Sequence, residues 1–246
     1  MDRMLYVAMS GARETFLAQA TNNNNLANAN TPGFQADLQQ FRSMPVFGDG
    51  HPTRVYALSE RPGIDFKRGS LAHTGRSLDV AVNGEGWIAV QSKDGSEAYT
   101  RRGDLMVDAN GILTTGNGLP LMGNGGPIAI PPAEKIEIGP DGTISIRPLG
   151  QAVNELAVID RVKLVNPDKS TLYKGNDGLL RQQSGEPLPA DGAIQLATGT
   201  IESSNVSVVD AMVDMIELSR RYEFQVKMMK TAGEIEQQSS SIMRTS

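Results

Sequence analysis

The chain has 246 residues, of which 39% are hydrophobic and 21% are charged. This length fits one large domain or two small ones with a real core. The formal net charge of -5 argues against nucleic-acid binding, which needs a basic face. The chain contains no cysteine, which excludes disulfides, thiolate zinc sites and cysteine nucleophiles. No run of residues has the length of a membrane span or the pattern of a secretory signal, so we expect neither membrane insertion nor Sec export.

The first thirty residues carry a helical pattern. One face recurs in steps of three or four, and most of its residues are small enough for another helix to approach closely: Leu5, Met9, Ala12, Phe16, Ala20, Asn23 and Ala27. The pattern stops before Pro32, because proline disfavours helical geometry in the preceding residue and lacks a backbone N–H. Residues 22–30 are rich in asparagine, which suits either a frayed last turn or polar contacts in a packed helix array.

Residues 35–75 show no clear period, and prolines and glycines recur through them. We predict an extended connector with one short strand near residues 54–58. A structureless segment of this length is unusual inside a compact domain, so we expect it to be functional or packed on a partner.

Residues 76–200 read as β structure. Asn-Gly and Asp-Gly pairs separate short runs in which apolar and polar residues alternate, a pattern typical of a many-stranded antiparallel meander. The pair Asn83-Gly84 is expected to close a hairpin between residues 78–82 and 87–90. Four glycines are predicted to sit in structural turns that need positive φ: Gly84, Gly111, Gly142 and Gly178.

Residues 207–238 are predicted to form one long helix, about 48 Å in length. One row of residues, which we call the predicted seam, alternates steps of four and three as a coiled coil does: Val208, Met212, Met215, Ser219, Tyr222, Val226, Met229 and Gly233. Such a seam needs a partner, and the N-terminal helix offers one. The predicted fold is therefore α+β, with long terminal helices paired as in a coiled coil and a mostly antiparallel β middle.

No residue constellation predicts an enzyme, a cofactor site or a metal site. Residues 84–89 fit the dinucleotide pattern G-x-G-x-x-A, but a strand and not a helix follows the glycines. Residues 104–111 resemble a calcium loop faintly, and their ligand spacing fails. The only histidines, His51 and His73, lie in or at the end of the connector without a catalytic partner nearby.

Four stretches together resemble the flagellar rod and hook axial protein family. They cover both ends and the middle of the chain: NNLANANTPGF (24–34), SLDVAVNGEGWIAV (77–90), YTRRGDLMVDANGILTTGNGLPLMG (99–123) and IESSNVSVVDAMVDMIELSRRYEFQVKMMKT (201–231). Within the family the chain is most similar to the proximal-rod type, and the distal-rod type is the close alternative. Distal-rod proteins usually carry Asn where Pro32 stands here.

The resemblance implies a structural subunit of the proximal rod of the bacterial flagellar basal body. Residues 1–34 and 201–246 would form an inner, axial helical domain, residues 35–75 a connector, and residues 76–200 a β-rich outer domain. Subunits of this family assemble into a tubular drive shaft that crosses the periplasm and transmits torque from motor to hook. The implied partners are copies of the chain, neighbouring rod proteins and the flagellar type III export apparatus, with no nucleic acid and no membrane insertion.

The assembly interface is expected on both terminal segments. Its predicted residues are Leu5, Met9, Ala12, Phe16, Asn23, Leu26, Ala27, Asn28, Pro32, Gly33, Phe34, Val208, Met212, Met215, Tyr222, Val226 and Met229. A soluble β-domain binding module that is dimerised by its helices stays open as an alternative. The two differ in geometry, because one gives an open helical assembly and the other a closed dimer.

Overall fold

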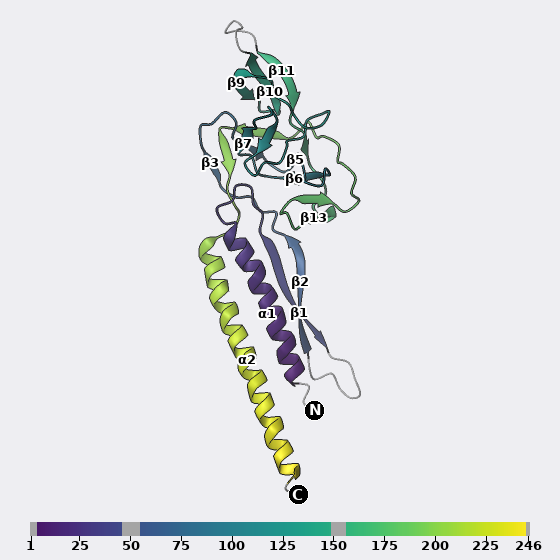
Figure 1. Ribbon diagram of the computed structural model, residues 1–246, viewed down its shortest axis with the longest axis vertical. Helices are drawn as coiled ribbons and strands as arrows, with labels where there is room; N and C mark the ends of the chain where they lie inside the picture. Colours follow the sequence, from purple (N-terminus) through teal and green to yellow (C-terminus); the bar gives the residue numbers. More distant parts are fainter. Residues whose placement is uncertain (1–3, 46–54, 149–155, 245–246) are drawn as a thin grey trace. The chain divides into compact units, whose positions relative to one another are not determined.

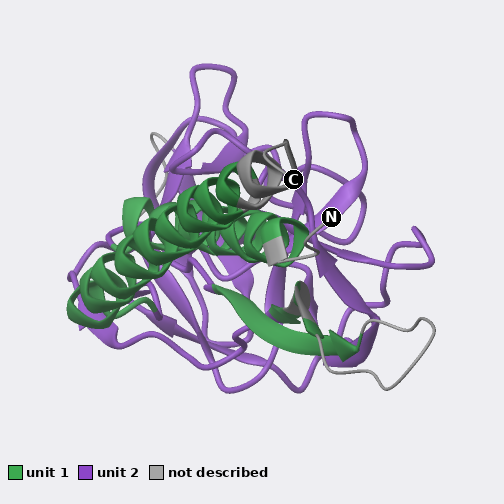
Figure 2. Cartoon of the chain, turned by 90° about the horizontal axis from the view of Figure 1, so that it is seen from below, with its two compact units in different colours: residues 1–29, 37–63, 206–246 green, residues 30–36, 64–205 purple. Residues whose placement is uncertain are grey.

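The computed structural model describes residues 4–45, 55–148 and 156–244. The chain forms two compact units, which Figure 2 shows in different colours. The first unit takes residues 1–29, 37–63 and 206–246, and the second takes residues 30–36 and 64–205. Within the described residues, no helix combines the length and the apolar content that a membrane crossing needs.

The first unit is built on two helices and a strand pair. Helix α1 (Met4–Ala27) lies along helix α2 (Val208–Arg244), and strands β1 (Asp37–Pro45) and β2 (Val55–Ile64) form a two-stranded sheet on the other side of α1 (Figure 1). Ser207 caps α2, because its hydroxyl accepts the backbone N–H of Asp210 at 3.4 Å. Glu217 and Arg221 pair one turn apart on α2, as the charge order favours.

The two helices pack through small residues. Ala8, Ala12 and Ala18 of α1 are buried. On α2 the buried positions are Ala211, Leu218 and Ala232, spaced by seven or fourteen residues. This row of mostly small residues lies between the helices, because alanines let the two backbones approach, and Ser219 of the predicted seam also contacts α1.

Polar side chains fix the register of the two antiparallel helices. The Asn22 side chain donates to the carbonyl oxygen of Ala211 at 2.7 Å, and Gln19 donates to the hydroxyl of Ser219 at 3.4 Å. Asn25 both donates to and accepts from the backbone of Asp37. Two of the consecutive asparagines therefore make polar contacts in packed structure, and helix α1 continues through them.

The described part of residues 35–75 has more strand structure than the predicted connector, and the short strand predicted near residues 54–58 overlaps β2. This segment contributes β1 and β2, and Gln39 of β1 donates to the hydroxyl of Thr21 on α1 at 2.9 Å. The strand period was hidden because most side chains of β1 are exposed and do not alternate. Residues 46–54, with His51, lie outside the described residues.

The second unit is antiparallel throughout its described strand pairs. Its largest sheet has the order β12-β5-β6-β14-β13: Leu164–Val165, Trp87–Gln91, Glu97–Thr100, Leu180–Gln182 and Leu172–Lys174. A three-stranded sheet has the order β11-β10-β9: Ala157–Arg161, Thr143–Pro148 and Ala133–Ile138. Three strand pairs complete it: β15-β4 (Gln195–Thr198, Val80–Asn83), β16-β3 (Thr200–Glu202, Leu71–His73) and β7-β8 (Leu105–Val107, Leu113–Thr115). One short 3-10 helix covers Lys169–Thr171.

Hairpins between paired strands form at four of the Asx-Gly pairs, whereas the hairpin predicted at Asn83-Gly84 is wrong. Residues 94–95, 110–111, 141–142 and 177–178 each join two strands that pair with one another. Asn83-Gly84 does not, because β4 pairs with β15 and β5 pairs with β6 and β12. Gly84 and Gly86 both take positive φ, at 105° and 127°, so the chain turns away between the two strands. The φ angles of Gly111, Gly142 and Gly178 are also positive.

The core of the second unit has two faces that meet at β5. Ile88 and Val90 point into the larger cluster, whereas Trp87 and Ala89 point into a smaller one with Tyr99. All five side chains are at most 1% exposed. This central strand is thus buried on both sides, which explains its nearly continuous apolar run.

Candidate assembly surface

The first unit leaves large apolar side chains in solvent. On α1, Met9 is 54% exposed and Phe16 is 61% exposed, and Leu5 is exposed as well. On α2, the exposed part of the predicted seam comprises Val208, Met212, Tyr222 and Val226, while Met215 and Met229 are half-buried. A folded monomer seldom exposes so many neighbouring apolar groups unless they meet another surface.

The remaining predicted helix positions fall into two groups. Ala12 is buried, so this chain's own fold already covers it. Asn23 and Ala27 are exposed, and Leu26 and Asn28 are half-buried. The structure therefore brings most, but not all, of the helix positions to an open face of the first unit.

A second exposed apolar row runs along α2 and ends in a residue that sequence reasoning missed. Its members are Val209, Val213, Ile216 and Phe224, of which Phe224 is 62% exposed. The helical spacing of residues 213, 216, 220 and 224 could have pointed to it. The interruption by Arg220 hid the pattern.

Pro32, Gly33 and Phe34 lie in the second unit and are not part of the helical surface. Gly33 has φ 67°, and its N–H donates to the carbonyl oxygen of Glu202 at 2.8 Å. A Cβ at Gly33 would lie 2.3 Å from the backbone of Arg101. The ring of Phe34 lies 4.0 Å below the ammonium of Lys174, a cation–π contact. This turn is held inside the unit by close packing.

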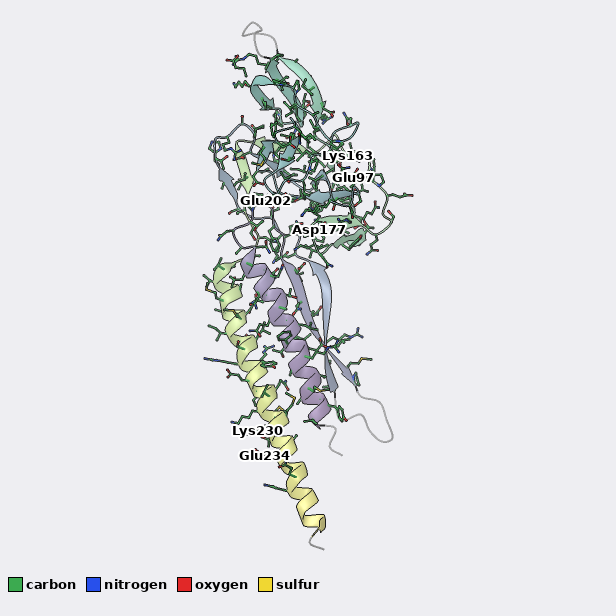
Figure 3. The ribbon with its side chains drawn as sticks, in the orientation of Figure 1. Glu97, Lys163, Asp177, Glu202, Lys230 and Glu234 are labelled. Carbon is green, nitrogen blue, oxygen red and sulfur yellow. The ribbon has the colours of Figure 1, made fainter. Side chains whose placement is uncertain are left out.

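A buried polar network surrounds that turn, and no local sequence pattern indicated it. The Arg101 guanidinium donates to the Glu202 carboxylate at 2.9 Å, and both side chains are at most 3% exposed. Arg101 also donates to the carbonyl oxygen of Gly84 and lies over the Trp87 ring. The indole of Trp87 donates to Gln35 at 3.2 Å. Glu202, labelled in Figure 3, lies at the end of strand β16 and is 101 residues away from Arg101 in the sequence.

Asn205 connects three parts of the second unit by hydrogen bonds: its own segment, the segment at Ala36 and the segment at residues 65–67. Its side-chain oxygen accepts the N–H of Ala36 at 2.8 Å, and its amide donates to the carbonyl oxygens of Asp65 and Lys67. Asp65 donates its own N–H to Ala36 at 2.8 Å. The chain passes between the units at residues 29–30, 36–37, 63–64 and 205–206, so one side chain fixes the ends of three connections.

The described residues show little that could do chemistry. Within residues 4–45, 55–148 and 156–244, no three His, Asp or Glu side chains gather as metal ligands. His73 is exposed at the end of β3. Burial raises the pKa of Tyr99, whose hydroxyl accepts the N–H of Leu188, which is the behaviour of a packed core tyrosine. The exposed apolar side chains of α1 and α2 favour a surface that contacts another molecule.

Models of flagellar axial families match three parts of the chain. The model of the flagella basal body rod protein matches residues 5–35, and the D1 domain of the flagellar hook protein FlgE/F/G matches residues 81–146. The C-terminal model of the flagellar basal body rod FlgEFG protein matches residues 197–242. These ranges include α1, the centre of the second unit and most of α2.

Curated relatives match over nearly the whole chain. The flagellar basal-body rod protein FlgF of Escherichia coli (strain K12) is 42% identical over 95% of this chain and 95% of its own length. FlgF of Salmonella typhimurium is 40% identical over 100% of both. The flagellar basal-body rod protein FlgG of Bacillus subtilis (strain 168) is 31% identical over 99% of this chain and 100% of its own length. The chain therefore belongs to the flagellar basal-body rod protein family, and it is more like these two FlgF proteins than this FlgG.

Proposed function

We propose that the chain is a structural subunit of the flagellar basal-body rod, in its proximal part, and that it assembles through its helical unit. The observation that carries the proposal is the exposed apolar surface of α1 and α2, which includes Phe16, Val226 and Phe224. The small residues between the helices hold the unit together, and the large apolar residues are left for neighbours. Many modest contacts repeated in every subunit make a stiff structure.

In this proposal the helices pair in the manner of a coiled coil and form an inner, axial domain, while the β structure forms an outer domain. The partners are copies of the chain and neighbouring rod proteins, and the subunit reaches its place through the flagellar type III export apparatus. Its role is mechanical, the transmission of torque from motor to hook. The likeness to proteins named FlgF supports the proximal position.

The test places a carboxylate on the exposed face of α2. Val226 is 41% exposed in the single chain, and Val226→Asp would put an unpaired charge into an interface that is dry in the rod. Desolvating an isolated charge costs several kcal/mol even after relaxation. This cost recurs in every subunit of the rod. We expect folded protein, absent or incomplete rods in electron micrographs of basal bodies, and non-motile cells.

The control is Gln183→Glu, which adds the same charge at an exposed position of the second unit. It should leave motility intact. Gln225, the immediate neighbour of Val226, is unsuitable because its amide lies against Gly11 of α1. Complete rods in Val226→Asp cells would show that this face is not an interface.

A further inference from the structure

A groove runs along α1 in the first unit. Its floor is made by small residues of α1, Gly11 and Thr15, and its walls are Phe41 of β1 and Phe224 and Gln225 of α2. Gly11 adds no side chain to the floor, and there is no room for one, because a Cβ there would lie 2.9 Å from the Gln225 amide. We call this the α1 groove.

The α1 groove continues towards the N-terminal end of the helix. A second hollow shares Gly11, Phe41 and Gln225 with the first and extends past Val7, Ala8 and Met228. The result is an apolar channel with helical walls on one side and a strand on the other. A helix with an apolar edge is the usual occupant of such a groove.

The α1 groove has a positive edge. Glu217 and Arg221 line it but pair with each other. Arg220 also lines it, and in the described part of the chain no carboxylate forms an ion pair with Arg220. An acidic segment would therefore fit this edge better than a basic one.

The C-terminal end of α2 is a helical segment that α1 does not cover. Ala232 is the last buried residue described on α2, and the helix continues to Arg244. Figure 1 shows this end of α2 running on beyond the described start of α1. Residues 233–244 span about 18 Å at 1.5 Å per residue. Ile235 is 52% exposed, and Glu234, labelled in Figure 3, is exposed beside it.

We propose that the α1 groove binds the C-terminal segment of α2, residues 233–244, from a second copy of the chain. In this arrangement Ile235 enters the apolar channel and Glu234 meets Arg220. The inference deepens the proposed function and rests on it, because it names which surfaces of two subunits meet.

The segment that fills the groove must come from another molecule, since one chain cannot place its own C-terminal segment there. Arg220 and Glu234 lie on the same helix, fourteen residues or about 21 Å apart. A contact between two different patches is heterologous, and it generates an open chain of subunits unless the rotation closes. A rod needs an assembly of this kind.

The first experiment introduces two cysteines, at Phe224 and Ile235, into the full chain, which has no cysteine of its own. The two positions are about 17 Å apart on one helix, beyond the roughly 7 Å that a disulfide can span, so any disulfide joins two copies. We expect oxidation of isolated basal bodies to give a series of species at multiples of the chain mass, starting at twice that mass, which reduction removes. The control pair, Tyr222→Cys with Ile235→Cys, places the first cysteine on the predicted seam and should give much less.

Complete rods without a cross-link from the Phe224 pair, or with an equal yield from the control pair, would overturn the groove inference while the proposed function stands. Absence of the unmodified chain from isolated rods would instead refute the proposed function.

The second experiment exchanges charges, and it covers the case in which the cysteine variants do not assemble. Arg220→Glu and Glu234→Arg should each weaken self-association of the purified chain about tenfold in sedimentation velocity at low salt. The variant with both changes should return to within about threefold of the unmodified chain. The control, Lys93→Glu, reverses an exposed charge of the second unit outside the groove lining and should have little effect. Singles that match the unmodified chain, or a double variant no better than the singles, would reject the pairing.

Discussion

Removal of the Glu202 carboxylate should destabilise the second unit strongly. Glu202 is 2% exposed, and its carboxylate accepts two hydrogen bonds, one from Arg101 at 2.9 Å and one from the N–H of Gly69 at 3.1 Å. Glu202→Ala would leave the guanidinium of Arg101 buried without a counter-charge. Breaking a buried pair in this way costs about 3–5 kcal/mol.

For a unit of roughly 150 residues, each kcal/mol moves the melting temperature by about 2–4 °C, so the expected loss is on the order of 10 °C. The measurement is calorimetry of the full chain, followed on the transition of the second unit. The double variant Arg101→Met with Glu202→Met should recover much of this loss, because replacing both charges by apolar groups removes the desolvation cost as well.

The matched control is the exposed pair of Lys169 and Glu85, whose side chains are 42% and 58% exposed. Lys169→Ala should leave the melting temperature close to that of the unmodified chain, since solvent screens such pairs. If Glu202→Ala melts no lower than Lys169→Ala, the reasoning about the buried pair is wrong.

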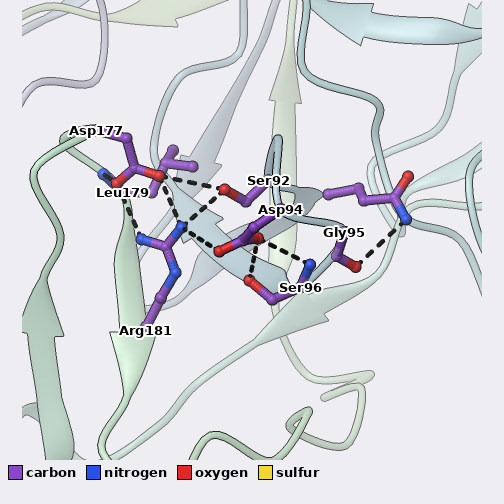
Figure 4. A network of polar contacts seen from close by, with 8 residues as sticks. Ser92, Asp94, Gly95, Ser96, Asp177, Leu179 and Arg181 are labelled. Atoms are coloured by element: carbon purple, nitrogen blue, oxygen red, sulfur yellow. Dashed lines mark hydrogen bonds and ion pairs between the residues drawn. The ribbon is translucent and has the colours of Figure 1, made fainter.

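Three further outcomes are expected in the second unit. Gly33→Ala should lower the free energy of unfolding in urea by more than about 2 kcal/mol, because positive φ adds to an overlap with the backbone. Gly84→Val should cost less, about 1–3 kcal/mol, because only the φ of 105° opposes it and no atom lies within 4 Å of the new Cβ; equal losses for the two variants would contradict this order. The hydrogen bond from Arg181 lowers the pKa of Asp177 from 3.8 to about 2 (Figure 4). The ionised carboxylate therefore stabilises the fold fully at pH values above 3.8, and this stability is lost as the pH falls towards about 2. Melting curves of Arg181→Gln between pH 5 and pH 2 should show a smaller loss than the unmodified chain over roughly that window, and an identical loss would contradict the assignment.

Local patterns predicted the elements whose partners lie close in the sequence. Each correct hairpin joins consecutive strands across an Asx-Gly turn, where the two turn residues alone fix the connection. The pairs β4–β15 and β3–β16 join strands more than a hundred residues apart. No turn records these pairings, so the sequence could indicate antiparallel strands but not their order. The same distance separates Arg101 from Glu202, which is why their ion pair could not be predicted.

Periodicity predicted two long helices, but the buried positions of α2 lie beside the predicted seam, of which Ser219 still contacts α1. Several rows of a helix carry apolar residues at a spacing of three and four, and hydrophobicity alone favours the row with methionines and valines. Size decides between them. The buried alanines at 8, 12 and 18 of α1 are too short to reach a distant neighbour, and the small residues Ala211 and Ala232 allow α2 to approach closely.

This choice of row separates folding from assembly within the first unit. The helices hold each other through small buried groups and through the amides of Gln19 and Asn22, so the fold of the unit does not need the large apolar side chains outside. An exposed phenylalanine such as Phe16 or Phe224 gains little in the single chain, because most of its surface stays in water until a neighbour covers it. When a neighbour covers this apolar surface, its burial stabilises the association by about 25 cal/mol per Å². Substitutions at the small positions should act on the helix pair itself, whereas substitutions at the large exposed positions should act on contacts between subunits. In the proposed rod, the same chain would therefore be folded before assembly and would still contribute its apolar surface to contacts between subunits.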